Sequence, residues 1–258
     1  MMNKELEFAK QLARDAGEIM LRYFNQSDIS HYKADNTIVT LADTEINQMV
    51  IDRVEESYPD YGVYGEEDSF GRDNEKLWVC DPIDGTAMFA RGVPVAVFSL
   101  ALVVDGEPIV GVVYDPFTDS LYEATKGGGA RCNNEPIIVN EFTLGDKEFS
   151  IGYDYSPTMP INTLTVAYPL AERCRVGGVG SFVRNAVLVA TGGFGCSIMS
   201  GSRPYDIAAA KVIVEEAGGK VTDIYGNEQR YDRDINGAIV SNGIVHDEII
   251  KTIKENLK

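Results

Sequence analysis

Nine consecutive residues organise this chain: Trp78-Val79-Cys80-Asp81-Pro82-Ile83-Asp84-Gly85-Thr86. The apolar run before Asp81 predicts a strand, and the proline and the Asp-Gly step predict that it becomes a loop within three residues. Both carboxylates can then be aimed at one point beyond the strand, where the Ile83 carbonyl adds a third hard oxygen. Such a set suits Mg²⁺. Asp-Pro or Asp-Gly alone would indicate only a turn.

The Gly85-Thr86 step follows these acids directly. It offers backbone N–H groups where a helix begins, and such groups bind phosphate oxygens. Metal ligands and an anion cradle are therefore predicted side by side.

Composition and charge limit the classes of protein to consider. The 258 residues are 44% hydrophobic, enough for a substantial core. Forty acidic residues against twenty-three basic ones give a net charge of −17, which argues against a nucleic-acid polymer as partner. The longest apolar run, residues 93–104, is too short to span a bilayer, so no membrane partner is expected.

The cysteines and histidines exclude other chemistry. The four cysteines show no C-x-x-C pair, so we expect reduced thiols and a soluble, cytoplasmic protein. His31 and His246 are too few for a histidine-centred site, and neither a G-x-S-x-G elbow nor a P-loop occurs.

The first part of the chain predicts helices followed by antiparallel strands. Helical spacing of apolar residues runs from Leu6 to Tyr23, and a second helical pattern follows the polar loop 33–43 and ends at Pro59. Strands are expected at 95–104, 108–114, 121–124 and 137–139, with an Asp105-Gly106 hairpin turn. We predict an N-terminal α+β half, residues 1–145, with a meandering antiparallel sheet.

Three further acids stay ambiguous on local evidence. Asp43 falls in the first turn of the second helix, where aspartate usually caps or meets the helix dipole. Glu66 and Glu67 lie on an acidic loop before the Asp81 strand. Acidic loops are mostly solvated, yet metal sites gather carboxylates from neighbouring strand ends, so both interpretations stand.

The second part alternates strands and helices and predicts a C-terminal α/β half, residues 146–258. Strands are expected at 149–153, 174–176, 195–199, 221–224 and 238–241, and helices at 161–171, at 181–190, from 203 to 217 and from 247 onward. Asp206 would lie in the first turn of the third helix, at the positive end of its dipole.

The chain resembles the magnesium-dependent, lithium-sensitive phosphatases typified by inositol monophosphatase. The resemblance rests, in order along nearly the whole chain, on Val39-Thr40-Leu41-Ala42-Asp43, Gly65-Glu66-Glu67, the Trp78 to Thr86 string, Gly111-Val112-Val113-Tyr114-Asp115-Pro116, and Asp206 to Gly219. It implies a layered α-β-α-β-α sandwich, typically a homodimer.

The resemblance also implies metal ligands. Glu66, Asp81 and the Ile83 carbonyl would hold one Mg²⁺, and Asp81, Asp84 and Asp206 a second, with Glu66 sharing a weaker third ion. Mn²⁺ is an alternative to Mg²⁺.

Catalytic and phosphate-binding roles follow from the same resemblance. Asp43 and Thr86, beside Glu66, would orient and activate the attacking water, and Gly85 and Thr86 would hold the phosphate through backbone N–H groups. Paired ions generate hydroxide near neutral pH and neutralise phosphoryl charge.

Departures from the family pattern concern the substrate. Inositol phosphatases of the family carry a glutamate for a sugar hydroxyl where this chain has Met199, so inositol specificity is in question. Tyr205 replaces the usual tryptophan, and bulky residues follow Ser181. These side chains would line the leaving-group side. Arg184 and Arg203 either meet a second anionic group or balance surface charge.

Three functional hypotheses remain. The first is Mg²⁺-dependent hydrolysis of a small phosphate monoester by metal-activated water. The second keeps the chemistry on a sugar bisphosphate, adenosine 3′,5′-bisphosphate or NADP. The third is a non-catalytic divalent-ion-binding regulatory module, which would need neither Asp43 nor Thr86.

Overall fold

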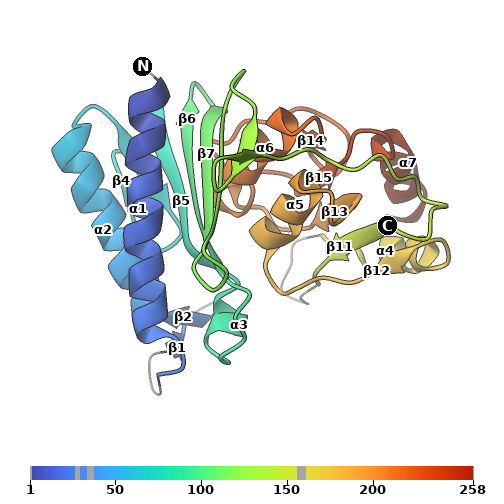
Figure 1. The fold of residues 1–258 in the computed structure, drawn as a ribbon, viewed down its shortest axis with the longest axis horizontal. Helices are drawn as coiled ribbons and strands as arrows, with labels where there is room; N and C mark the ends of the chain where they lie inside the picture. The colour runs from blue at the N-terminus through green and yellow to red at the C-terminus, as the bar shows by residue number, and fades with distance from the viewer. Residues whose placement is uncertain (1, 27–29, 34–37, 156–160, 258) are drawn as a thin grey trace.

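The structure is a computed structural model that describes residues 2–26, 30–33, 38–155 and 161–257, so part of the predicted polar loop, residues 34–37, lies outside it. Five layers stack within these residues (Figure 1). They are helices α1 (Met2–Tyr23) and α2 (Leu41–Ser57), an eight-stranded sheet, helices α5 (Phe182–Ala190) and α6 (Ala208–Glu216), a five-stranded sheet, and helices α4 (Leu164–Ala171) and α7 (His246–Asn256). The predicted α-β-α-β-α sandwich is confirmed.

The first sheet has the strand order β10-β9-β8-β7-β6-β5-β3-β4. Its strands are β3 (Gly62–Gly65), β4 (Ser69–Phe70), β5 (Lys76–Asp84), β6 (Val97–Val104), β7 (Glu107–Asp115), β8 (Ser120–Thr125), β9 (Ala130–Cys132) and β10 (Glu135–Pro136). Asp105 and Gly106 join β6 to β7 with φ values of 49° and 81°, as a two-residue hairpin turn requires. A small ribbon of β1 (Ser30–Tyr32) and β2 (Ile38–Thr40) precedes α2.

The antiparallel meander predicted from residue 93 onward is confirmed by the pairing of β6 through β10 in sequence order. The other end of the sheet holds a parallel pair that the sequence did not predict. There β3 pairs with β5 in parallel, Gly65 lying opposite Cys80. The reason is β4, which folds back antiparallel to β3 along its outer edge. The chain thereby returns to the starting end before β5 begins. The carboxyl ends of β3 and β5 consequently meet at one edge of the sheet.

The second sheet has the order β12-β11-β13-β15-β14 and mixes parallel with antiparallel pairs. Its strands are β11 (Ser150–Tyr153), β12 (Arg175–Val176), β13 (Cys196–Met199), β14 (Lys220–Thr222) and β15 (Ala238–Ser241). Expected strand 221–224 ends at Thr222 because the Asp223 carboxylate accepts N–H bonds from Tyr225 and Asn227 and forms a turn. The strand expected at 137–139 does not form, because its backbone hydrogen bonds go to two different segments. The Ile137 N–H donates to the Ala130 carbonyl and the Val139 N–H to the Ala217 carbonyl.

The helix expected to open at residue 203 is divided. A 3₁₀ turn, η1 (Pro204–Asp206), comes first, and α6 begins two residues after Asp206. Ile207 interrupts the two elements with φ −147° and donates its N–H to the Pro204 carbonyl. Asp206 therefore precedes α6 and does not lie in its first turn.

Three apolar cores separate the layers. One lies between α1, α2 and the first sheet, the second between the two sheets around α5 and α6, and the third between the second sheet and α4 and α7. The boundary predicted after residue 145 stays a prediction. All four cysteines are free thiols, and every helix within the described ranges is too short or too polar to cross a bilayer.

Candidate active site

Asp81 and Asp84 lie at the end of β5, where the strand bulges against β6. Asp81 pairs with Ser99 and Asp84 with Val97, so β5 holds one residue more than β6 over this interval. The extra residue brings both carboxylates to the same face of the sheet. Pro82 occupies the bulge, where its missing N–H is tolerated. A regular strand would have placed the two acids on opposite faces.

Glu66 reaches the same edge because β3 runs parallel to β5. Its N–H donates to the Cys80 carbonyl at 3.1 Å, which places Glu66 beside the first residue of the bulge. The Lys33 ammonium lies 3.3 Å from Glu66 Oε1 and 2.6 Å from Glu67 Oε1. Asp43, Glu66 and Glu67 each offer a carboxylate oxygen within 4.8 Å of the others.

Asp43 is both a helix cap and a member of this cluster. It is the third residue of α2, and its Oδ2 accepts from the Thr40 N–H at 2.8 Å and the Thr40 hydroxyl at 2.5 Å. Its Oδ1 lies 3.1 Å from the Thr86 hydroxyl, which is 2.8 Å from the Ile83 carbonyl. The capping interpretation and the predicted partnership of Asp43 with Thr86 are therefore compatible.

Asp206 is delivered by η1, which packs against β5 and β6. The preceding Tyr205 ring meets Tyr64 edge to face, with centroids 5.9 Å apart. Tyr64 and Arg203 both donate to the Asp234 carboxylate, at 3.1 and 2.8 Å. This places an aromatic pair between the strand that leads to Glu66 and the turn that carries Asp206.

Burial and mutual repulsion raise the pKa values of these acids. Burial and the charges of Glu66, Asp84 and Asp206 raise the pKa of Asp81 well above its usual range, and burial with Asp84 does the same for Asp206. Burial raises the pKa of Asp43 and of Asp84 to about 7, against the lowering effect of their hydrogen bonds. When ionised, the carboxyl groups of the cluster therefore carry more negative charge than the neighbouring cationic side chains neutralise.

Gly85 turns the chain from β5 into the short helix α3 (Thr86–Phe89). Its φ of +94° suits glycine, and a Cβ there would lie 3.0 Å from the Gly180 carbonyl and 3.2 Å from Ser181 Cβ. The predicted anion cradle is thus packed against a loop from the other half of the chain.

Ser181 belongs to that loop, and its hydroxyl donates to Asp84 Oδ2. The N–H groups of Phe182 and Val183 donate to the same carboxylate, at 3.3 and 2.8 Å. Asp84 therefore accepts the orphan donors at the N-terminus of α5, for which Ser181 is also the N-cap. The substrate-binding role expected of Ser181 stays a prediction.

The structure also gives Arg184 and Met199 definite surroundings. Arg184 Nη1 lies 2.5 Å from Oδ2 of the buried Asp115, and the described residues offer its guanidinium no second hydrogen-bond partner. Met199 ends β13 and is 2% exposed, in the core between the sheets. A Cβ on Gly201 would lie 3.0 Å from Asp206 Oδ2 and 3.9 Å from Met199 Cγ. The Met199 and Asp206 side chains therefore both border Gly201.

The donor set fits divalent ions of the Mg²⁺ type. All its side-chain ligands are carboxylates, and hard oxygens suit Mg²⁺. The Lys33 ammonium between Glu66 and Glu67 occupies a position where a cation is electrostatically favoured. Glu66, Asp81, Asp84 and Asp206 are the residues that would hold such ions, with the Ile83 carbonyl nearby.

Comparison with known proteins agrees with this geometry. The chain matches the Inositol monophosphatase family over residues 1–258. The chain belongs to the inositol monophosphatase family. It is 34% identical over 252 residues to a fructose-1,6-bisphosphatase/inositol-1-monophosphatase of Thermotoga maritima, covering 97% of this chain and 96% of that one. It is 32% identical to a histidinol-phosphatase of Chlorobaculum parvum, covering 98% and 97%.

A solved structure shows the same fold. An IMPase of Thermotoga maritima superposes with a TM-score of 0.87 at 33% identity, covering 98% of this chain and 97% of that one. The chain is therefore a phosphatase of the inositol monophosphatase family.

Sequence reasoning missed two polar residues at this family site. Lys33 lies in the predicted polar loop, yet it pairs with both Glu66 and Glu67. The buried hydroxyl of Ser99 has no hydrogen-bond partner among the described residues. Ser99 faces Asp81 across the strand pair. Its signal in the sequence was its position as the polar interruption of the apolar run 93–104.

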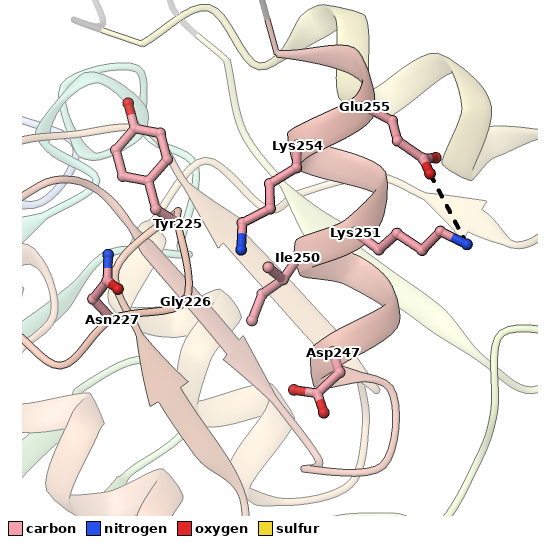
Figure 2. Close-up of a pocket in the computed structure, with 8 residues that line it drawn as sticks. All are labelled: Tyr225, Gly226, Asn227, Asp247, Ile250, Lys251, Lys254 and Glu255. Atoms are coloured by element: carbon pink, nitrogen blue, oxygen red, sulfur yellow. Dashed lines mark ion pairs between the residues drawn. The ribbon is translucent and has the colours of Figure 1, made fainter.

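A surface hollow of about 590 Å³ lies elsewhere, between α7 and the turn that contains Tyr225 and Asn227 (Figure 2). Lys254 extends toward Tyr225 and Ile250, whereas Lys251 points away and pairs with Glu255 at 3.9 Å. The hollow contains none of the acids above, so it is separate from the phosphatase site.

Proposed function

We propose that this phosphatase hydrolyses a small phosphate monoester in a Mg²⁺-dependent reaction. One observation carries the proposal: four segments far apart in sequence bring Asp43, Glu66, Asp206 and the β5 pair Asp81 and Asp84 to the edge where β3 and β5 end. Clustered acids with raised pKa values in a buried setting are typical of a functional site.

The acids divide into two ligand groups in this proposal. Glu66, Asp81 and the Ile83 carbonyl hold one ion, and Asp81, Asp84 and Asp206 the other, while Glu66 contributes to a weaker third. When bound, Mg²⁺ supplies Lewis-acid polarisation of the phosphoryl oxygens and acidifies the attacking water. Mn²⁺ meets the same hard-oxygen preference.

Asp43 and Thr86 orient the water. Thr86 Oγ1 has one proton, and it lies within hydrogen-bond distance of Asp43 Oδ1 and of the Ile83 carbonyl. Either donation leaves a lone pair of Oγ1 to accept a hydrogen bond from water. The backbone N–H groups of Gly85 and Thr86 hold the phosphate where α3 begins.

Support for the substrate class comes from the relatives and from Met199. The Thermotoga maritima relative is named for fructose-1,6-bisphosphate and inositol-1-phosphate, and the Chlorobaculum parvum relative for histidinol phosphate. Met199 offers no acceptor for a sugar hydroxyl, which costs a polyol phosphate a charge-assisted hydrogen bond of about 1.5–3 kcal/mol. We therefore place inositol phosphate below a sugar bisphosphate in preference.

The test is a panel of phosphate esters assayed with Mg²⁺, with Mn²⁺ and with excess chelator. Phosphate release should need the added ion and return when it is restored. Full activity in chelator would contradict the metal role. Tight Mn²⁺ binding without turnover of any ester would favour the non-catalytic regulatory module. Lithium inhibition and a homodimer on light scattering are expected from the family resemblance alone.

The role of Arg184 needs a separate measurement. Arg184→Gln removes the charge while keeping a donor for buried Asp115, and it should lower kcat/KM for a bisphosphate about tenfold more than for a simple monoester. Arg173→Gln is the matched control, since Arg173 is exposed and its one ion pair among the described residues is with Glu248 at 2.6 Å. Equal losses on both ester classes would show that Arg184 serves the ion pair with Asp115 and not the substrate.

A further inference from the structure

The Asp154 carboxylate organises the loop that contacts the phosphatase site from the C-terminal half. Asp154 follows β11, and its two oxygens accept from the Gly180 N–H at 3.0 and 3.1 Å. The Asn185 amide donates to Oδ2 at 2.5 Å. One carboxylate thus joins the end of a strand, a glycine of the loop and the first turns of α5.

The loop closes around this carboxylate without spare room. A Cβ on Gly178 would lie 2.3 Å from Asp154 Oδ1, and the fully buried Asn185 accepts the Val179 N–H at 3.3 Å. Val179 and Gly180 hydrogen-bond to Asn185 and Asp154, and Gly178 packs closely against Asp154. The loop conformation therefore depends both on this network and on glycine at position 178.

The other face of the loop contacts the site itself. The Gly180 carbonyl lies 3.0 Å from the position of a Gly85 Cβ, and Ser181 donates to Asp84. The N–H groups of Phe182 and Val183 also donate to Asp84. A shift of the loop would therefore move three donors to Asp84 and the surface that supports the Gly85 turn.

We propose that Asp154 is a positioning residue that sets the orientation of Asp84 and of the Gly85 turn through the 178–181 loop. The proposal rests on the proposed function in taking Asp84 as a metal ligand. Within the described part of the chain, the Asp154 carboxylate bonds to Gly180 and Asn185 and to no acid of the site, so its effect passes through Ser181 and the N-terminus of α5.

Asp223 provides the comparison needed to separate positioning from stability. Asp223 is buried, whereas Asp154 is half-buried, and each follows a strand of the second sheet. The Asp223 carboxylate accepts from the N–H groups of Tyr225 and Asn227 at 2.9 and 2.7 Å and from the Asn227 amide at 3.2 Å. Its turn borders the hollow of Figure 2, whose lining includes none of the acids of the site.

The experiment compares Asp154→Asn with Asp223→Asn in the full-length protein. Both should lower Tm in chelator by a few degrees. Asp154→Asn should weaken Mn²⁺ binding, measured by titration calorimetry, about tenfold, because Asp84 is misaligned. Asp223→Asn should change it less than about twofold. Equal Mn²⁺ affinities in the two variants would overturn the proposal.

A double-mutant cycle tests the route. In the Asp84→Asn background, Asp154→Asn should alter Mn²⁺ affinity by less than about twofold, since the group through which it acts is gone. Undiminished tenfold weakening there would also overturn the proposal. If Asp154→Asn does not fold, Asn185→Ala carries the test, with several-fold weaker Mn²⁺ binding expected and unchanged binding contradicting it. A wild type that binds no Mn²⁺ and releases no phosphate would instead contradict the proposed function.

Discussion

Two regions of this phosphatase hold buried polar groups of different kinds. At the end of β5, four aspartates and Glu66 crowd together, and Asp81 accepts an N–H bond only from Ile83 at 3.0 Å among the described residues. At the first residue of α7, the buried His246 ring has a partner at each nitrogen, with Ser241 Oγ 2.8 Å from Nδ1 and Thr222 Oγ1 2.9 Å from Nε2.

The bonds around His246 specify one neutral tautomer. Thr222 donates its hydroxyl proton to the Asp223 carbonyl at 2.9 Å, so it accepts from Nε2–H. Ser241 accepts the Gly243 N–H at 3.1 Å and can donate its own proton to Nδ1. Burial, with the charge of Lys220, lowers the pKa of His246 to about 4. This region satisfies its polar groups internally and contributes to folding.

The acidic region, by contrast, destabilises the fold, as the raised pKa values of its carboxyl groups indicate. Its carboxylates repel one another in a buried setting, which destabilises the metal-free fold. Function tolerates this because a bound cation removes the repulsion, whereas an apolar or fully paired cluster would bind none. The His246 region thus stabilises the fold, whereas the acidic cluster at the end of β5 destabilises it in the absence of metal.

The largest expected effect comes from removing single acids at the β5 edge. Asp84→Asn and Asp206→Asn should each lower kcat on the order of a hundredfold or more, through loss of the shared ion and its charge stabilisation. In chelator, Asp206→Asn should be at least as stable as wild type to urea, because one repelling charge is gone. Near-normal turnover at saturating Mg²⁺ would show that these two acids do not hold an ion that catalysis needs.

A smaller effect concerns pH. The folded pKa values of Asp43 and Asp84 are raised to about 7, so the folded state binds more protons than the unfolded state between about pH 4 and 7. Stability in chelator should therefore fall by a few kcal/mol as pH rises through this window. Mg²⁺ at pH 8 should restore it. The measurement is Tm at pH 5 and 8 with and without Mg²⁺, and Asp84→Asn should flatten the chelator trend. A chelator Tm that rises with pH would contradict the description of this region.

The smallest effect is expected at His246, with the opposite sign. Its folded pKa is depressed, so its contribution is present above the unfolded value of about 6.5 and is lost as pH falls toward about 4. The stability advantage of wild type over His246→Gln should shrink by about 1–3 kcal/mol between pH 7 and pH 4. Lys220, Asp247 and Glu228 are the charged groups that influence the ring. Urea unfolding of both proteins at the two pH values measures the change, and a constant difference would show that the pKa of the ring is the same in the folded and unfolded states.

Local features of this chain followed from its sequence. The nine-residue string predicted the end of β5 and the turn at Gly85, and the helical patterns predicted α1 and α2 with Asp43 in a first turn. Ser181 opened α5 as expected. These features depend on side-chain periodicity, turn residues and caps within a few positions of one another, which a single stretch of sequence specifies.

Contacts between distant segments were decided by the tertiary structure. The fold-back of β4 makes β3 parallel to β5 and brings Glu66 to Asp81, and packing of the two sheets around α5 brings Ser181 to Asp84 across 97 residues. The tertiary structure also decided three further features: the division of the Asp206 helix, the pairing of Arg184 with Asp115 and the Asp154 network. Each depends on the shape left between packed layers, and no local pattern encodes that shape because its walls come from opposite ends of the chain.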